Sequence, residues 1–201
     1  MAKIKLTKNE LKVQRDDLTR FKRFLPTLQL KKQSLQTEVR RLARELVERK
    51  KLEEQARAEM ESWVRLFAEP FDFAPFIAPR AIRIGQGNVV GVNIPVLEEV
   101  EYETRMPDPH ATPAWTDEGV LVLRRLLALR LEREVLKLQH ALLGEELRTT
   151  TQRVNLFEKV KIPECRERIR RIQIFLGDQQ TAGVARAKLA KGKTSVREIL
   201  A

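Results

Sequence analysis

Residues 11–46 read LKVQRDDLTRFKRFLPTLQLKKQSLQTEVRRLAREL, and this stretch decides the fold. Two series of positions seven residues apart run through it, one starting at Leu11 and the other at Gln14, and most of their members are apolar. An alternation of three and four sustained over many turns keeps one apolar stripe along a slightly under-wound helix. This is the condition for a left-handed coiled coil. The pattern continues past residue 60 and predicts one long helix from Leu6 to Glu69.

Ten apolar residues of this helix are predicted to form its seam, the stripe that packs against a partner helix. They are Leu11, Leu18, Phe21, Leu25, Leu28, Leu35, Val39, Leu42, Leu46 and Met60. Thr7 followed by Glu10 is typical of a capping box at the start of a helix. Pro26 interrupts the pattern, and we expect it to bend the helix because proline lacks a backbone donor.

A second long helix is predicted from about Asp117 to Gln180. Its seam residues are Leu138, Leu142, Leu147, Val154, Ile162, Ile169, Ile172 and Leu176. The phase of the apolar positions slips by one residue near Pro163, which predicts an irregularity there. Beyond Gly177 the chain is rich in Ala, Lys and Gly and has no clear seam, so we expect residues 181–201 to form a disordered basic tail.

The segment between the two helices has a different composition, with most of the prolines and a β-branched run. Ala81–Ile84 and Val89–Ile94 are predicted to be strands, joined by a hairpin turn at Gly85–Asn88. Val96–Glu103 is predicted to be extended, and Met106–Pro113 to be a loop.

The chain therefore divides into four predicted segments: helix 1–69, a Pro/Gly-rich hairpin region 70–116, helix 117–180 and tail 181–201. Two helices of similar length can bury their seams by folding back on each other. The predicted fold is mainly α, a long antiparallel two-helix coiled coil with a small β-hairpin region in the middle of the chain. The hairpin region is expected at the end away from both termini.

The charge distribution leaves more than one kind of partner open. The net charge is +11, made up of +7 in residues 1–69, −3 in residues 70–116 and +7 in residues 117–201. Basic charge of this size suits an acidic protein partner, an anionic surface or a nucleic acid. Nucleic-acid readers usually place aromatic residues among basic ones for stacking, and aromatic residues make up only 5% of this chain. We therefore expect no nucleic-acid partner, although a basic nucleic-acid-binding hairpin and a free-standing coiled-coil scaffold stay as alternatives.

No constellation of catalytic, cofactor-binding or metal-binding residues is predicted. Cys165 is the only cysteine, and together with two histidines it is too little for a closed zinc site. Gly85-Gln86-Gly87 and Gly192-Lys193-Thr194 resemble parts of phosphate-binding loops, but neither has the spacing that such loops need. No secretory signal and no apolar run long enough for a membrane span are visible, so we expect a cytoplasmic protein that does not insert into the membrane.

Three stretches resemble one known family. Residues 6–11 (LTKNEL) and 25–32 (LPTLQLKK) resemble the amino-terminal helix of the D subunit of the V-type (A/V-type) ATPases. Residues 90–95 (VGVNIP) resemble the central segment of that family. The run 153–158 (RVNLFE), followed by Ile162-Pro163, resembles the R-V-N-x-x-E…I-P run of its carboxy-terminal helix. The family-motif positions are Arg153, Asn155, Glu158 and Pro163.

The resemblance implies a non-catalytic component of the central stalk, the rotor shaft of a rotary ATPase. It implies as partners the A and B subunits, whose hexamer surrounds the coiled coil, the small F subunit of the stalk and the adaptor protein on the membrane ring. The chain is then expected to couple ATP hydrolysis or synthesis to ion transport, and to lie in the cytoplasm, peripheral to the membrane, with no cofactor of its own.

Overall fold

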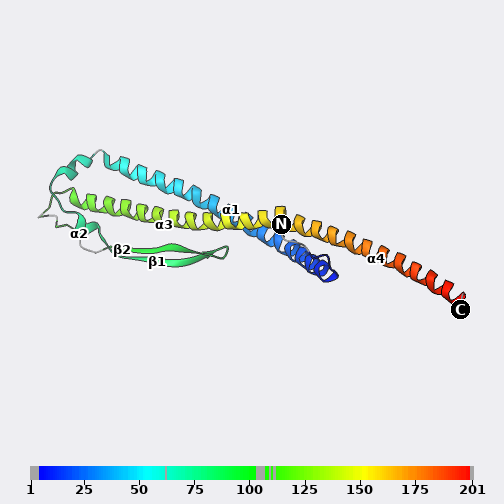
Figure 1. Cartoon of the computed structure of the whole chain (residues 1–201). Helices are drawn as coiled ribbons and strands as arrows, with labels where there is room; N and C mark the ends of the chain where they lie inside the picture. Colours follow the sequence, from blue (N-terminus) through cyan, green and yellow to red (C-terminus); the bar gives the residue numbers. More distant parts are fainter. Residues whose placement is uncertain (1–4, 62, 103–106, 109, 111, 200–201) are drawn as a thin grey trace. The chain divides into compact units, whose positions relative to one another are not determined.

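The computed structural model of the chain describes residues 5–61, 63–102, 107–108, 110 and 112–199, with residues 192–199 described by their backbone alone. Within these residues the chain is mainly helical with one β-hairpin, as predicted (Figure 1). The elements in chain order are α1 (Lys8–Glu61), the 3-10 helix η1 (Val64–Ala68), α2 (Ala74–Ile77), β1 (Pro79–Val89), β2 (Val92–Tyr102), α3 (Thr116–Asn155), the π-helical segment η2 (Leu156–Lys161) and α4 (Ile162–Ile199).

These elements form two compact units. One consists of the residues up to Leu30 together with those from Thr150 onward, and the other of Lys31–Thr149. We call them the terminal unit and the hairpin unit. Each contains a stretch of α1 and a stretch of the helices that follow the hairpin, so the prediction of two long helices at the two ends of the sequence is confirmed.

Helix α1 begins next to a capping residue and ends before a short 3-10 helix. The backbone N–H of Glu10 donates to Thr7 Oγ1 at 3.3 Å, so Thr7 caps the helix as predicted. Pro26 lies inside α1, which continues past it. The helix ends at Glu61 rather than at the predicted Glu69, and a short 3-10 helix follows.

An aromatic cluster explains this early end. The rings of Phe67 and Phe73 lie 5.1 Å apart, and those of Phe67 and Trp115 lie 5.2 Å apart. The indole N–H of Trp115 also donates to Glu69 Oε2 at 3.0 Å. These contacts join the residues after α1 to those before α3. A straight continuation of α1 would separate them, because aromatic pairs need ring centroids within about 7 Å.

The hairpin is longer than predicted, and its turn lies elsewhere. β1 and β2 pair antiparallel with Val89 opposite Val92, so the turn is the two-residue loop Val90-Gly91 rather than Gly85–Asn88. Both turn residues have positive φ, 53° and 77°, the conformation of the tight turns that match strand twist. The side-chain oxygen of Asn88 accepts a hydrogen bond from the Gly91 N–H at 3.1 Å.

The two glycines that suggested a turn at Gly85–Asn88 lie within β1, and Gly87 allows close packing inside the hairpin. A Cβ on Gly87 would lie 2.9 Å from a methyl group of Val96, and a Cβ on Gly85 would overlap the carboxylate of Glu98. Both glycines therefore lie inside β1, and the turn prediction was wrong because glycine serves close approach as well as turning. Of the other predicted pieces of this region, residues 103–106, 109 and 111 lie outside the described residues.

The core of the hairpin unit joins both helices to the hairpin. Leu35 and Leu42 of α1, Ile94 of β2 and Leu143 of α3 are buried together. Val89, Val90 and Val92 at the tip of the hairpin pack against this cluster, and Figure 1 shows the strands running alongside α3. A two-stranded hairpin is at best marginally stable alone in water, so packing on the helices is what holds it. In this unit the hairpin thus lies along the helices and does not form a separate end piece.

The terminal unit differs most from the prediction at its carboxy-terminal end, where a disordered tail was expected. α4 continues through Ile199, so the expectation of a disordered segment from residue 181 is wrong for residues up to 199. The sequence of this part is rich in Ala, Lys and Arg, which are strong helix formers even without a packing partner. The absence of a seam was therefore a poor reason to predict the absence of a helix.

Candidate functional site: the paired helices

In the hairpin unit α1 and α3 run antiparallel, and cross-helix ion pairs fix their alignment. Lys31 Nζ lies 2.7 Å from Glu146 Oε1, and Arg125 Nη1 lies 3.8 Å from Glu59 Oε2. Residue numbers rise along α1 while those of the partners fall along α3. The first pair is partly exposed and the second is exposed, so each contributes at most about 1 kcal/mol, and their role is alignment more than strength.

All ten predicted seam residues of α1 are at least half-buried. Leu35, Leu42 and Met60 are buried and the other seven are half-buried. Two polar residues share the stripe with them, since Gln14 and Glu53 are buried as well. The stripe is therefore apolar with polar positions built into it.

The seam of α3 in the hairpin unit differs from the prediction. Leu138 and Leu142 are 57% and 40% exposed, whereas Val135, Gln139 and Leu143 are buried. The predicted assignment of Leu138 and Leu142 is thus wrong by one position. Leucines occur on more than one face of α3, so periodicity alone could not choose the buried face. Contact with the hairpin chooses it, because Gln139 Nε2 donates to the carbonyl oxygen of Pro95 at 2.6 Å.

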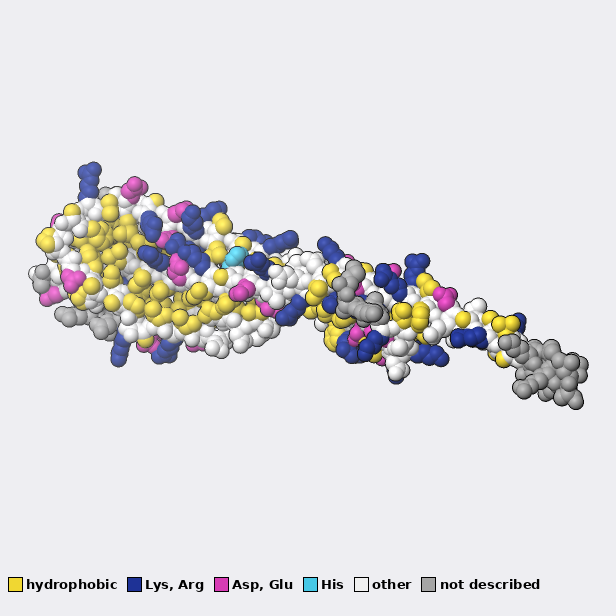
Figure 2. Space-filling model, in the orientation of Figure 1, with side chains coloured by type: hydrophobic (Ala, Val, Ile, Leu, Met, Phe, Trp, Pro, Cys, Tyr) yellow, Lys and Arg dark blue, Asp and Glu magenta, His cyan; other side chains and the backbone are white. Residues whose placement is uncertain are grey.

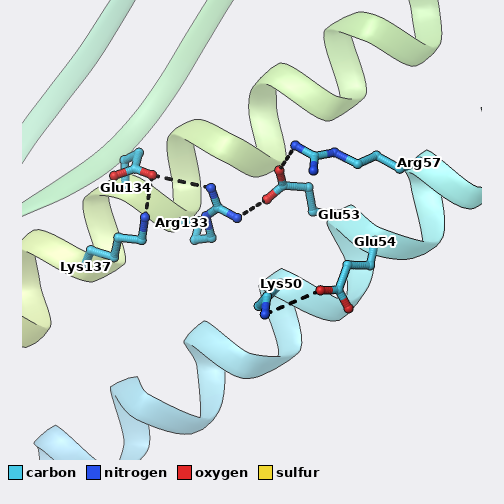
Figure 3. A network of polar contacts seen from close by, with 7 residues as sticks. All are labelled: Lys50, Glu53, Glu54, Arg57, Arg133, Glu134 and Lys137. Atoms are coloured by element: carbon cyan, nitrogen blue, oxygen red, sulfur yellow. Dashed lines mark hydrogen bonds and ion pairs between the residues drawn. The ribbon is translucent and has the colours of Figure 1, made fainter.

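Glu53 is the centre of a polar network inside the helix pair (Figure 3). Its side chain is 3% exposed, and its two oxygens lie 2.5 Å from Arg133 Nη1 of α3 and 2.6 Å from Arg57 Nη2 of its own helix. Arg133 also approaches Glu134, whose pKa is lowered below its ordinary value chiefly by the hydrogen bond from Lys137. A buried carboxylate needs such partners, because an unpaired charge in the interior is costly.

In the sequence Glu53 is a charged residue at a position of the apolar series that starts at Leu11. From the heptad pattern alone, it is a break in the apolar stripe. The signal that identifies it is the combination of a seam position with Arg57 one helical turn later, which suits an ion pair between residues four apart. The cross-helix partner Arg133 is 80 positions away and is visible only in the fold.

In the terminal unit the beginning of α1 packs against η2 and α4. The rings of Phe21 and Phe157 have centroids 5.0 Å apart with planes tilted by 53°. Asp17 of α1 lies near Cys165 of α4, and the negative charge of its carboxylate helps to raise the pKa of the Cys165 thiol. As in the hairpin unit, higher numbers on one helix meet lower numbers on the other, so this pair is antiparallel as well.

The predicted slip near Pro163 takes the form of the π-helical segment η2. Burial continues from Val154 through half-buried Phe157 to Ile162, a step of five residues where an α-helix alternates three and four. The backbone N–H of Ile162 donates to the carbonyl of Phe157, the spacing that defines a π-helix. One extra residue is thus absorbed, and Ile162 and Ile172 stay buried on the same face.

The remaining predicted positions differ in exposure. Leu147 of the hairpin unit and Ile169 and Leu176 of the terminal unit are half-buried. The four family-motif residues, Arg153, Asn155, Glu158 and Pro163, are exposed and flank or lie within η2. Exposure places the polar side chains of Arg153, Asn155 and Glu158 where a partner can reach them, and the functional role of all four residues stays a prediction.

The single cysteine, Cys165, lies in the interior of the terminal unit. Cys165 is buried, and burial, aided by Asp17, raises the pKa of its thiol. Among the described residues no cluster of histidine, cysteine and carboxylate side chains has a composition and arrangement suited to a metal ion. In the same part of the chain, none of the helices combines enough length with enough apolar character to cross a membrane.

Comparison with known proteins agrees with this geometry. The model of the family described as the ATP synthase D subunit matches residues 10–192. The V-type ATP synthase D subunit of Borreliella burgdorferi is 44% identical over 191 residues, which cover 95% of this chain and 95% of that protein. The V-type ATP synthase D subunit of Chlamydia felis is 34% identical over 200 residues, covering 98% and 96%. These matches extend over both units, and the chain therefore belongs to the ATP synthase D-subunit family.

Proposed function

We propose that this chain is a central-stalk component, the rotor shaft, of a V-type rotary ATPase. It couples ATP hydrolysis or synthesis in a hexamer of A and B subunits to ion transport through the membrane sector. The observation that carries the proposal, beside the family, is the antiparallel pairing of long helices in each unit by an apolar stripe and cross-helix contacts. This is the construction that a torque-bearing element needs.

Torque transmission follows from how such a pair resists deformation. Twisting one helix against the other has to break buried contacts, and interior packing is dense and resists compression. Cross-helix ion pairs and the Glu53–Arg133 contact oppose sliding of α1 along α3. An antiparallel pair also presents different side chains on each side, so that it can contact the sites of a surrounding hexamer unequally.

The partners proposed for the chain follow the family. The A and B subunits surround part of the helix pair, the small F subunit of the stalk binds beside it, and the adaptor protein joins it to the membrane ring. The chain itself is non-catalytic. It lies on the cytoplasmic side, peripheral to the membrane, and its sequence lacks a complete phosphate-binding loop, since Ala187 stands where the first glycine before Gly192-Lys193-Thr194 is needed.

The test is reconstitution of the complex in vesicles with and without this chain. With the chain, ATP hydrolysis should drive ion uptake. Without it, any hydrolysis that the A and B subunits retain should move no ions. Ion uptake at the full rate in its absence would contradict the proposal. Calorimetry on the isolated chain should detect no stoichiometric ATP binding.

A further inference from the structure

The hairpin unit contains a groove that the proposed shaft function does not use. It encloses about 840 Å³ between α1, β2 and α3. Its walls include Leu52 of α1, Val96 and Val100 of β2, and Val135 and Leu136 of α3. Leu52 and Val96 are 40% and 38% exposed, so part of this apolar lining faces solvent. Figure 2 shows hydrophobic side chains gathered over this part of the molecule, where Figure 1 labels the hairpin and α3.

The charge of the groove is opposite to that of the chain. Five carboxylates line it, against Arg49 as the cation among its described lining residues. Arg49 pairs with Glu132 at 3.0 Å. Within the described part of the chain, Glu48 and Glu98 have no ion-pair or hydrogen-bond partner. In a protein of net charge +11, this is a local negative surface with carboxylates left to pair.

The residues that line the groove follow helical spacing on both helices, so a third helix can lie along them. On α1 the lining residues follow helical spacing from Glu45 to Leu52, and on α3 from Ala128 to Gln139. Eleven residue steps along α3 correspond to about 16 Å, or three turns. A third helix can lie along two antiparallel helices in this way, placing its apolar stripe on the floor of the groove.

From this geometry we infer that the groove binds an amphipathic, basic helix of a partner protein. Its apolar stripe contacts Leu52, Val96 and Leu136, and lysine or arginine side chains on its flanks pair with Glu48 and Glu98. Such pairs at a rim favour encounter and orientation, while the apolar floor supplies most of the affinity. The inference goes beyond the shaft function and does not depend on torque.

The experiment uses the full chain and a synthetic 18-residue peptide of leucine and lysine, with leucines spaced three and four apart and a fluorescent label. Binding is measured by fluorescence anisotropy. The chain as a whole repels a cationic peptide, so saturable binding has to come from a local acidic surface. The same peptide with glutamate in place of lysine should bind at least tenfold more weakly.

Two matched variants locate the binding. Glu48→Lys with Glu98→Lys should weaken binding of the lysine peptide at least tenfold. Glu145→Lys with Asp178→Lys makes the same change of charge at exposed positions outside the groove and should alter binding less than threefold. Leu52→Ser tests the apolar floor and should weaken binding severalfold, with circular dichroism checking that each variant is folded.

The inference is overturned if the lysine peptide does not bind, if the glutamate peptide binds equally well, or if the two pairs of charge reversals have the same effect. Because binding is measured on the chain alone, any of these results leaves the shaft function to be judged by ion uptake in the assembled complex.

Discussion

Glu53 is the residue on which the alignment of α1 and α3 depends most directly. It holds one arginine on each helix, and its side chain is nearly excluded from water. An ion pair at a seam position specifies one alignment of two helices, because sliding by a turn would leave charges buried without partners. Apolar residues tolerate such sliding better, since contacts between them are not directional.

Replacing Glu53 by Ala should therefore lower the free energy of unfolding by about 3 kcal/mol. That is the lower end of the range for breaking a buried pair, because Arg133 keeps 20% of its side chain exposed. Urea unfolding of the isolated chain measures the change. Glu54→Ala, which removes an exposed pair with Lys50, is the matched control and should cost less than about 1 kcal/mol.

A double variant separates specificity from stability at the same site. Glu53→Leu with Arg133→Met removes both charges and should restore stability to within about 1 kcal/mol of the parent chain, because a buried ion pair can be replaced by packed apolar groups. If the double variant is as unstable as Glu53→Ala, the network stabilises the pair in another way.

Cys165 gives a prediction about pH. Its thiol pKa is raised by burial, so the folded chain holds the proton more tightly than the unfolded chain. The stability that this difference contributes is present below the ordinary pKa of a thiol and is lost as the pH rises through it toward the raised value. Urea unfolding at pH 7 and pH 10 should show a smaller decrease for Cys165→Ser than for the parent chain. Equal decreases would show that the thiol does not contribute.

At the scale of elements, η2 keeps the apolar residues of α4 on the side that faces α1, although their spacing in the sequence shifts by one residue. The apolar positions before and after it differ in phase by one residue, and a continuous α-helix would turn Ile162, Cys165 and Ile172 by about 100° away from α1. The π-helical turn absorbs the extra residue and keeps them buried. Pro163, which cannot donate a backbone hydrogen bond, is the second residue after the segment.

Deleting Lys159 should test this account, because it removes the extra residue without removing an apolar side chain. The step from Phe157 to Ile162 then falls from five residues to four, so a regular α-helix keeps the buried residues on the seam without a π-helical turn. We therefore expect the midpoint of urea unfolding to fall no further than in Lys159→Ala, which changes an exposed side chain. A deletion variant that loses the roughly 2–5 kcal/mol expected when one large aliphatic residue leaves the seam would contradict this account of η2.

At the scale of the whole molecule, the property that matters for the proposed function is how firmly each unit holds its two helices together. Phe21 and Phe157 are in ring contact in the terminal unit, and Leu28 is half-buried in the same unit. A weakened seam here can separate two helices locally while the rest of a long helical chain stays folded, since stability is not uniform along a structure.

Phe21→Ala with Leu28→Ala should therefore lower the number of ions moved per ATP hydrolysed more than it lowers hydrolysis itself. The measurement is ion uptake and hydrolysis in the same reconstituted vesicles. Lys22→Ala, an exposed change on the same helix, should leave the ratio unaltered. A double variant that assembles fully and keeps the parental ratio would refute the role of this region in coupling.

The sequence by itself determined the two long helices, the Thr7 cap, the burial of the α1 stripe and the position of the slip near Pro163. These follow from local rules: heptad spacing, capping chemistry and the missing donor of proline act within a few residues. The tertiary structure alone decided the features that depend on distant partners. Contact with the hairpin selected Val135, Gln139 and Leu143 over Leu138 and Leu142. The Val96 side chain of β2 packs closely over Gly87, and the turn falls at Val90-Gly91 instead. The physical reason is that which face of a helix is buried, and what a glycine is for, depends on groups that the chain brings together only when it folds.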